Sequence, residues 1–333
     1  MDSRNFQDID ALSGGVMYRN VMVPVDGSSF SREAVLQGLR IASQNGATLR
    51  LVRVASAPVL FSAPETMTLS SDAAKQLRAS ELASLYAMAA ECRAHSTVNV
   101  TASLEQGPVT DALIGYARRY AVDLIVMRTH ARRGLARVWF GSITDQLIRE
   151  SGIPVLVVRP PSVATALENG PHYKRILVPL DGSELAEQSL ASAVALAQIG
   201  GASITLLRVV SSSAQAADGE LESDIGPAAQ KDVMEAQRYL GLLPVIYGKS
   251  IPVSRRVVVS DDVAGTILHV AECEEADLIA IATRGRGALA RAAAGSVSDR
   301  VMREAPVSAL VVHPIERAVV SRPVPVLTQP MAV

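Results

Sequence analysis

Short apolar runs alternate with longer segments of helical periodicity along the chain, and polar or glycine-containing turns separate them. An apolar run of about five residues is typical of a strand buried in a parallel sheet. In the first half the pattern predicts strands at 20–25, 48–55, 98–104, 123–127 and 154–158. It predicts helices at 32–43, 71–95 and 109–120 and a last helix that ends near residue 150. Strands that alternate with helices indicate an α/β fold, a parallel sheet with helices on both faces.

The second half of the chain repeats this order. Residues 19–54 align with 174–209 at a shift of 155 positions, which places VMVPVDGSS over ILVPLDGSE. Near the end of each half the dipeptides Gly141-Ser142 and Gly295-Ser296 align at a shift of 154, so one residue has been lost between. A period of this length indicates a duplicated domain rather than a solenoid repeat.

The duplication predicts two tandem domains of ordinary size. The boundaries we expect are a flexible N-terminus at 1–18, domains at 19–160 and 174–313, a linker at 161–173 and a disordered tail at 314–333. The Ser/Ala-rich stretch 211–226 is expected to be a mobile loop.

Composition narrows the class of protein. The chain is 49% hydrophobic and 20% charged, with a net charge of −1, which is typical of a globular protein and gives no argument for a nucleic-acid or membrane partner. The N-terminus has no signal-peptide core, and two cysteines exclude a disulfide scaffold, so we expect a cytoplasmic location. Cys92 and Cys273 are interpreted as small core residues.

Two loops in each half carry the candidate chemistry. One is the Asp-Gly-Ser turn after the first strand, and the other is the glycine- and arginine-rich loop after the fourth strand, at 128–144 and 282–298. Because the second loop ends in Gly-Ser before a helix, Ser is expected to cap that helix, whose free amides attract phosphate. Ligands of open parallel sheets bind where the winding reverses, so the two loops meet only in the strand order 3-2-1-4-5. Asp26 and Asp181 would then face an adenine or ribose, unless they are only acids at a helix start.

These motifs resemble the universal stress protein family, and the chain is similar to a tandem, two-domain member with the adenine nucleotide alpha hydrolase-like fold. Members with the pattern G-x-x-G-x9-G-S/T bind ATP. In the second half Gly285 and Gly295 are separated by nine residues, and Ala282 replaces the first glycine. For this half the resemblance implies nucleotide contacts from Pro179, Asp181, Val209, Ile281, Ala282, Gly285, Gly295, Ser296, Val297 and Ser298.

The first half departs further from the pattern. Its matching residues are Pro24, Asp26, Val54, Met127, Arg128, Ala131, Gly141, Ser142, Ile143 and Thr144. Arg128 and Ala131 replace both early glycines, at positions where glycine lets the backbone approach a ligand. The Arg128 side chain would either fill the pocket or swing out and pair with a phosphate. We therefore expect the second half to hold the better site.

Other candidate groups are weaker. The loop arginines 132, 133, 137, 284, 286 and 291 either steer phosphate or are solvated. His130 has no second histidine or cysteine near it in sequence, so no metal site is expected. No catalytic triad or pair of carboxylates is visible, and the Walker lysine is missing.

The resemblance implies a non-enzymatic stress-response regulator that binds ATP, with or without Mg²⁺. The alternative is a structural or interaction protein of the same fold that has lost nucleotide binding. A slow ATPase would need a base or a P-loop lysine that the motifs do not supply. The apolar last strands of the halves, at 155–158 and 307–312, are expected to join them as a pseudo-dimer, and two chains are expected to associate as a homodimer.

Overall fold

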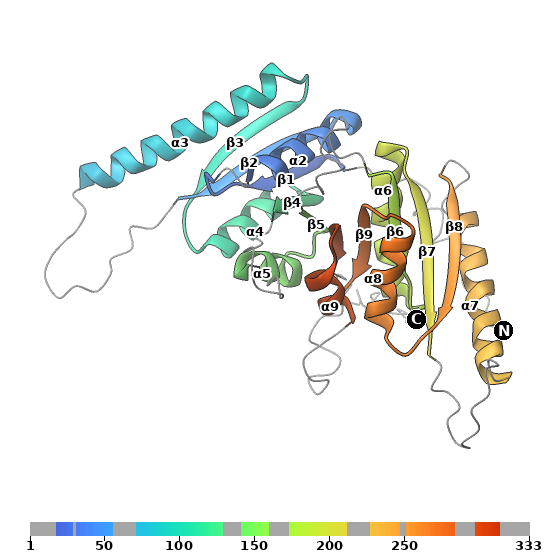
Figure 1. Cartoon of the computed structure of the whole chain (residues 1–333). Helices are drawn as coiled ribbons and strands as arrows, with labels where there is room; N and C mark the ends of the chain where they lie inside the picture. The colour runs from blue at the N-terminus through green and yellow to red at the C-terminus, as the bar shows by residue number, and fades with distance from the viewer. Residues whose placement is uncertain are drawn as a thin grey trace, which may run out of the picture.

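The computed structural model describes residues 18–28, 31–55, 71–128, 141–159, 173–211, 227–246, 251–283 and 297–313. Their strands form one ten-stranded sheet in the order β3-β2-β1-β4-β5-β10-β9-β6-β7-β8 (Figure 1). Each half contributes five neighbouring strands, so the sheet continues from one half into the other.

In the first half every expected element is present, and its ends lie within two residues of the expected ones. The strands are β1 (Asn20–Pro24), β2 (Thr48–Val54), β3 (Asn99–Glu105), β4 (Leu124–Arg128) and β5 (Val155–Val158). The helices are α2 (Ser31–Asn45), α3 (Ser71–Ala94), α4 (Val109–Arg119) and α5 (Ser142–Glu150).

The second half repeats the same order of elements. Its strands are β6 (Arg175–Pro179), β7 (Ser203–Val210), β8 (Val253–Val259), β9 (Leu278–Ala282) and β10 (Ser308–Val312). Its helices are α6 (Glu184–Gly200), α7 (Pro227–Ile246), α8 (Val263–Cys273) and α9 (Val297–Glu304). None of the helices in the described ranges is both long and apolar enough to cross a bilayer.

Strand pairing confirms both topological expectations. Within each half the neighbouring strands are parallel, and the order is 3-2-1-4-5, with the first and fourth strands side by side. The halves join through their last strands, because β5 and β10 pair antiparallel with Leu156 opposite Leu310. The expected pseudo-dimer is therefore formed within one chain.

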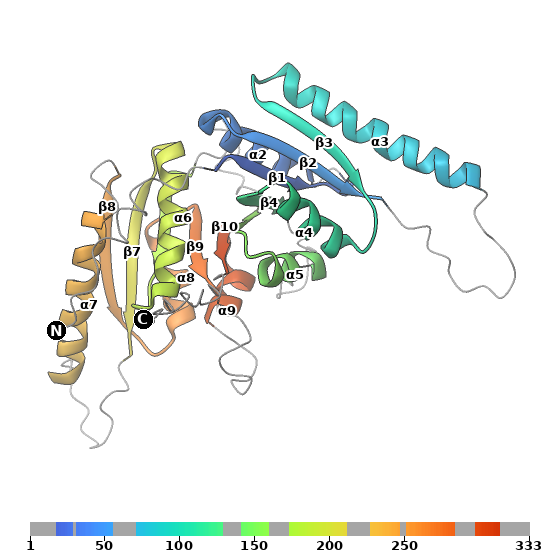
Figure 2. The same cartoon turned by 180° about the vertical axis from the view of Figure 1, so that it is seen from behind.

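Helices lie on both faces of the sheet (Figure 2), and an apolar layer that runs through both halves lies between the sheet and the helices on each face. Residues of a strand alternate between the two layers, so Leu156 and Val158 belong to one layer, and Val155 and Val157 to the other. The first layer packs under α2, α3, α6 and α7, and the second under α4, α5, α8 and α9.

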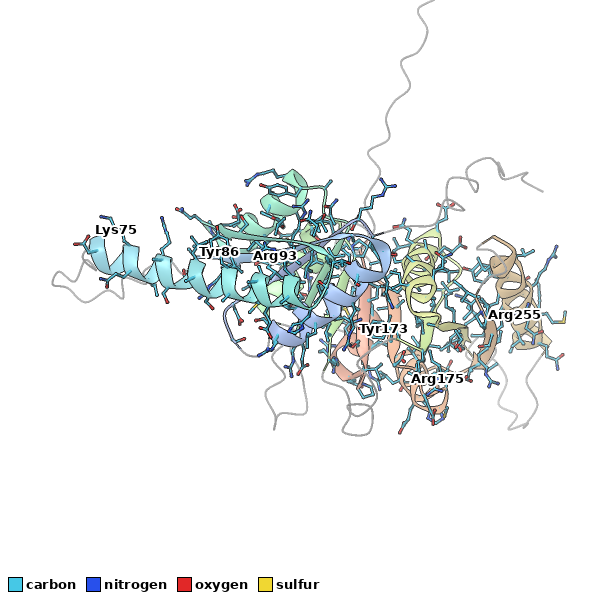
Figure 3. All side chains as sticks on the ribbon, turned by 90° about the horizontal axis from the view of Figure 1, so that it is seen from above. Lys75, Tyr86, Arg93, Tyr173, Arg175 and Arg255 are labelled. Carbon is cyan, nitrogen blue, oxygen red and sulfur yellow. The ribbon has the colours of Figure 1, made fainter. Side chains whose placement is uncertain are left out.

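The ends of the halves are more ordered than the sequence suggested. Tyr18, assigned above to a flexible N-terminus, is fully buried, and its hydroxyl donates to the Ser192 carbonyl of the other half over 3.2 Å. Tyr173, assigned to the linker, is buried as well and lies near the junction of the halves (Figure 3). Each tyrosine stands at the entry to the first strand of its half, where its ring joins the core layer that both halves share. Because the flanking residues are polar, the sequence alone did not indicate that these tyrosines join the core.

One of the two cysteines lies in the core, and the other does not. Cys92 is buried in α3, as expected, whereas Cys273 is exposed at the end of α8, so its assignment to the core is wrong. The position explains the error, because Cys273 is the last residue of α8 and lies between the exposed Glu272 and the C-cap residue Glu274. The expected flexible segment 1–17, mobile loop 212–226 and disordered tail 314–333 lie outside the described residues.

Candidate functional site

The candidate residues of each half gather at the carboxyl end of the sheet, where its first and fourth strands are neighbours. Val21 and Met22 of β1 pair with Leu124 and Ile125 of β4. In the second half Leu177 of β6 pairs in the same way with Ile279 of β9. Pro24 and Met127, and likewise Pro179 and Ile281, therefore lie at the carboxyl ends of adjacent strands, at a point where the winding of the sheet reverses, which is where open α/β sheets bind ligands.

The turn after the first strand has the same geometry in both halves. Asp26 accepts hydrogen bonds from the backbone N–H of Ser28 (2.9 Å) and from its hydroxyl (2.6 Å). Asp181 accepts from the Ser183 N–H (3.0 Å) and hydroxyl in the same way. An aspartate that bonds to the residue two positions ahead builds an Asx turn, which fixes the carboxylate at the mouth of the crevice.

Glycine is required at the centre of this turn. Gly27 and Gly182 have φ angles of +82° and +81°, a left-handed conformation that side chains rarely adopt. At Gly27 an added Cβ would also lie 2.7 Å from Nη1 of Arg53.

An arginine on the second strand supports each turn from below. Arg53 pairs with the buried Glu81 of α3 over 2.9 Å, and Glu81 is only 5% exposed. In the second half Arg208 donates instead to the Leu180 carbonyl over 3.2 Å. Neither arginine was predicted to have a role, although their identity at matching positions of the repeat is a signal that could have found them.

Tyr239 is a second residue near the Asp181 turn that the sequence did not single out. Its hydroxyl donates to Glu187 of α6 over 3.0 Å. Burial raises the pKa of this phenol above its usual value, and the negative charge of Glu187 raises it further. The hydroxyl therefore stays protonated, and Tyr239 joins α7 to α6 beside the candidate site.

The apolar candidates lie at the carboxyl ends of the strands, close to the two turns. Met127 and Ile281 are buried, and Val54 and Val209 are half-buried at the carboxyl ends of β2 and β7. All of them pack on the layer under α4, α5, α8 and α9. Such a surface suits the face of a planar base better than it suits phosphate.

The start of α5 offers free backbone amides. Gly141 is the N-cap residue, it is exposed, and no side chain bonds to the amides of the first turn. Ser142 is the first residue inside the helix, so the expectation that Ser caps it is wrong; glycine at the N-cap leaves the amides of the first turn open to an anion. Ser142 and Ile143 are exposed, while Thr144 turns into the core.

The equivalent helix of the second half, α9, begins at Val297, which is exposed, and Ser298 is buried. Several candidates lie outside the described residues: Ala131, Gly285, Gly295, Ser296, His130 and the loop arginines 132, 133, 137, 284, 286 and 291.

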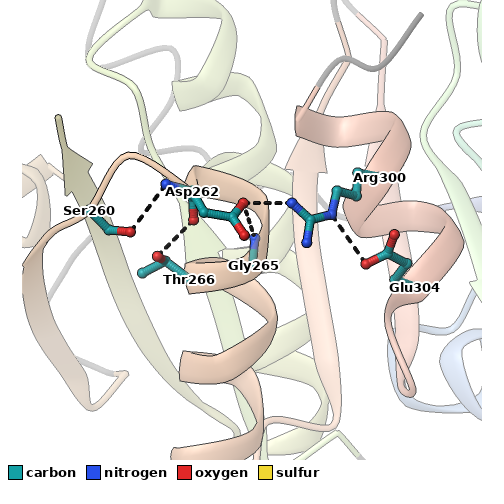
Figure 4. A network of polar contacts seen from close by, with 6 residues as sticks. All are labelled: Ser260, Asp262, Gly265, Thr266, Arg300 and Glu304. Atoms are coloured by element: carbon teal, nitrogen blue, oxygen red, sulfur yellow. Dashed lines mark hydrogen bonds and ion pairs between the residues drawn. The ribbon is translucent and has the colours of Figure 1, made fainter. Parts of the chain in front are cut away.

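Side chains tie each of these helices to its neighbour. In the second half Asp262 caps α8 by accepting from the Gly265 N–H (3.0 Å) and also accepts from Arg300 of α9 (2.6 Å), as Figure 4 shows. Arg300 reaches Glu304 as well. In the first half Thr110 of α4 donates to Gln146 of α5 over 2.8 Å. Gln146 and Arg300 occupy equivalent positions of the repeat, so one helix position fixes the helix after the glycine loop in both halves.

The two crevices differ most at the end of the fourth strand. Arg128 ends β4, and its guanidinium pairs with Glu33 in the first turn of α2 over 2.9 Å. The Arg128 side chain is 14% exposed, so it lies within the protein rather than swinging out to solvent. The second half has Ala282 and Gln188 at these two positions, and neither can form such a pair.

No group of three or more histidine, cysteine, aspartate or glutamate side chains that could hold a metal ion is found among the described residues. The described part of the crevice thus combines an oriented carboxylate, an apolar floor and, in the first half, an open helix start. This arrangement can bind a base, a ribose and an anionic group; it presents no nucleophile poised beside a base.

The model of the universal stress protein family matches residues 17–159 and again residues 172–313. A universal stress protein of Mycobacterium tuberculosis is 28% identical over 302 residues, which are 87% of this chain and 96% of that protein. One from Methanocaldococcus jannaschii is 28% identical over 151 residues, 45% of this chain and 86% of its own length.

Solved structures agree at the level of the fold. A universal stress protein from Archaeoglobus fulgidus has a TM-score of 0.64 at 17% identity, covering 88% of this chain and 98% of its own. One described as a putative universal stress protein, from Pseudomonas aeruginosa, has a TM-score of 0.62 at 16% identity, covering 91% and 95%. Since the family model matches each half separately and together spans most of the chain, the protein belongs to the universal stress protein family, with two domains of that family in tandem.

Proposed function

We propose that this protein binds ATP at the carboxyl edge of its second half and acts as a nucleotide-dependent regulator, not as an enzyme. The observation that carries the proposal is the meeting of the Asp181 turn with the end of β9, where the residue is Ala282 and not a long side chain such as Arg128. Val209 and Ile281 would contact the adenine, Asp181 the ribose, and the loop that ends in Gly295 and Ser296 the phosphates. The mapping of these roles follows the family resemblance.

Magnesium would enter with the nucleotide. Three-carboxylate metal sites are absent from the described ranges, so an ion would be held mainly by the phosphates of ATP. Binding measured with and without Mg²⁺ separates this contribution.

Regulation rather than hydrolysis is supported by the loop sequence. Its Gly-Ser ending lacks the lysine that P-loop enzymes place on the β- and γ-phosphates. The expected result is stoichiometric binding without steady release of phosphate. Sustained turnover that Asp181→Ala abolishes would instead identify an ATPase.

A second candidate function rests on one observation. Ala282 places a methyl group where the family pattern has glycine, and a pocket that cannot admit a nucleotide would leave a purely structural or interaction protein. Mass spectrometry of small molecules released from the purified, denatured protein distinguishes the two, because only a binding protein carries adenine nucleotide through purification.

The decisive test is calorimetric titration of the full chain with ATP after Gly295→Val. The added side chain lies where the phosphates should approach, and losing a hydrogen bond to a charged group costs about 1.5–3 kcal/mol. We therefore expect affinity to fall about tenfold to a hundredfold. Ala282→Gly should leave affinity equal or raise it.

The repeat supplies a matched control. Gly141→Val makes the same change at the equivalent position of the first half, where an added Cβ meets no atom within 4 Å. It should leave ATP affinity unchanged. Equal affinity of the wild type and a folded Gly295→Val protein would place the site elsewhere.

A further inference from the structure

The ion pair between Arg128 and Glu33 lies across the first crevice. Arg128 comes from the end of β4, and Glu33 from the first turn of the helix that follows the β1 turn. These are the two sides of the switch point, so the pair joins them directly. We infer that this pair closes the first site, and that the wild-type protein holds one nucleotide per chain, in the second half. The inference rests on the proposed function and adds its stoichiometry and the residues that determine it.

The position of the pair explains why an anion would be excluded. Glu33 is an acid in the first turn of α2, and its negative charge beside the crevice opposes the approach of an anion. The Arg128 guanidinium would otherwise attract a phosphate, but it already pairs with the Glu33 carboxylate over 2.9 Å. Because the Arg128 side chain is only 14% exposed, separating the pair would leave a largely buried charge without its partner, which is costly.

In the second half the two residues of the pair change together. At the matching positions Gln188 is exposed and Ala282 ends β9, so both members of the pair are replaced together. Ala282 has no side chain long enough to reach across the crevice. The half that keeps more of the nucleotide-binding pattern is thus the half that lacks the pair.

The remaining described parts of the first crevice are still built for a ligand. Its Asp26 turn has the geometry of the Asp181 turn, with φ angles of +82° and +81° at the central glycines. Gly141 leaves the first amides of α5 without a side-chain cap. Within the described residues, the ion pair is the difference between the two crevices that joins the end of the fourth strand to the helix after the first-strand turn.

The test exchanges the two positions between the halves of the full chain. Calorimetric titration with Mg-ATP should give one equivalent bound by the wild type. The double variant E33Q/R128A gives the first half the residues of the second and should bind two equivalents. The reciprocal variant Q188E/A282R builds the pair into the second half and should bind none, and it remains decisive if E33Q/R128A fails to fold.

Each outcome has a defined meaning. Thermal unfolding confirms that every variant compared is folded. Two equivalents in the wild type, one in folded E33Q/R128A, or undiminished binding by folded Q188E/A282R overturns the inference while leaving nucleotide binding intact. No binding by any of the three proteins overturns the proposed function, and the inference with it.

Discussion

Two aspartates of the second half lie in opposite electrostatic surroundings. Asp277, just before β9, accepts from the backbone N–H groups of Lys174 (2.6 Å) and Arg175 (3.2 Å). Burial nevertheless raises the pKa of its carboxyl group, and these hydrogen bonds only offset part of that rise. For exposed Asp262 the Gly265 N–H, and then Arg300, lower the pKa.

These shifts predict opposite dependences of stability on pH. The stabilising contribution of a carboxyl with a raised pKa is present below its ordinary pKa and is lost as pH rises through the raised value. The stability of the wild type relative to Asp277→Asn should therefore fall between acid and neutral pH. For Asp262 the contribution is present above the ordinary pKa and is lost as pH falls, so stability relative to Asp262→Asn should rise over the same interval.

Urea unfolding of the three proteins between about pH 3 and about pH 7 measures both differences. Each variant serves as the control for the other, because acid denaturation through other groups cancels in the comparison. Differences of the same sign for both sites would contradict the assignment.

The sequence identified residues whose type is unusual at their position, but it did not identify the residues that they contact. Arg128 stood out because it replaces a glycine, yet its pairing with Glu33 depends on a helix start and a strand end that only the fold brings together. Arg53 and Glu81 are 28 residues apart in the chain and meet beneath the Asp26 turn. A local pattern carries no information on such contacts, whereas the paired change to Gln188 and Ala282 was visible in the repeat.

At the level of elements, β5 is a strand that needs a neighbour. All four of its residues are buried, with β4 on one side and β10 on the other. The apolar sequence of β5 alone indicated that another strand must cover its edge, and the duplication indicated that this strand is the last strand of the second half. The helix cap was harder to predict from the sequence, because Gly-Ser is compatible with a serine cap as well as with the glycine cap that α5 has.

The isolated first half, residues 1–160, should therefore dimerise. Without β10 the apolar β5 edge is open, and a second copy can supply an antiparallel β5 in its place. Sedimentation equilibrium should report twice the mass of the fragment. In the full chain, which is the control, β10 already occupies the β5 edge, so any association of full chains cannot use this edge. A folded fragment that remains monomeric at high concentration would contradict this view of the edge.

At the scale of the molecule, the halves share their cores instead of merely touching. Leu147 and Val301, from α5 and α9, belong to one apolar layer, and Arg149 of α5 lies close enough to Asp299 of α9 for that charge to contribute to the rise of its pKa, after Asp145. Tyr18 and Arg159 bond across the junction, the latter to the Met302 carbonyl over 2.5 Å. Chains of two domains often unfold in steps, but this arrangement couples the halves.

We expect one cooperative thermal transition for the whole chain. Leu147→Ala removes a fully buried side chain from the shared layer and should cost about 2–5 kcal/mol. Differential scanning calorimetry should show the single peak moving to lower temperature without splitting. Two resolved peaks, with only one displaced by the substitution, would show that the halves unfold independently.

The antiparallel pairing of β5 with β10 also gives the molecule two unlike poles. The carboxyl ends of β1 and β4 point in one direction along the strands, whereas the carboxyl ends of β6 and β9 point in the opposite direction. The crevice with the Arg128 ion pair and the crevice with Ala282 therefore open in opposite directions. A partner that docks over one crevice cannot contact the other crevice directly. A nucleotide bound in the second half would therefore be accessible to partners on one side of the molecule alone. An assembly of such chains would have the same orientation.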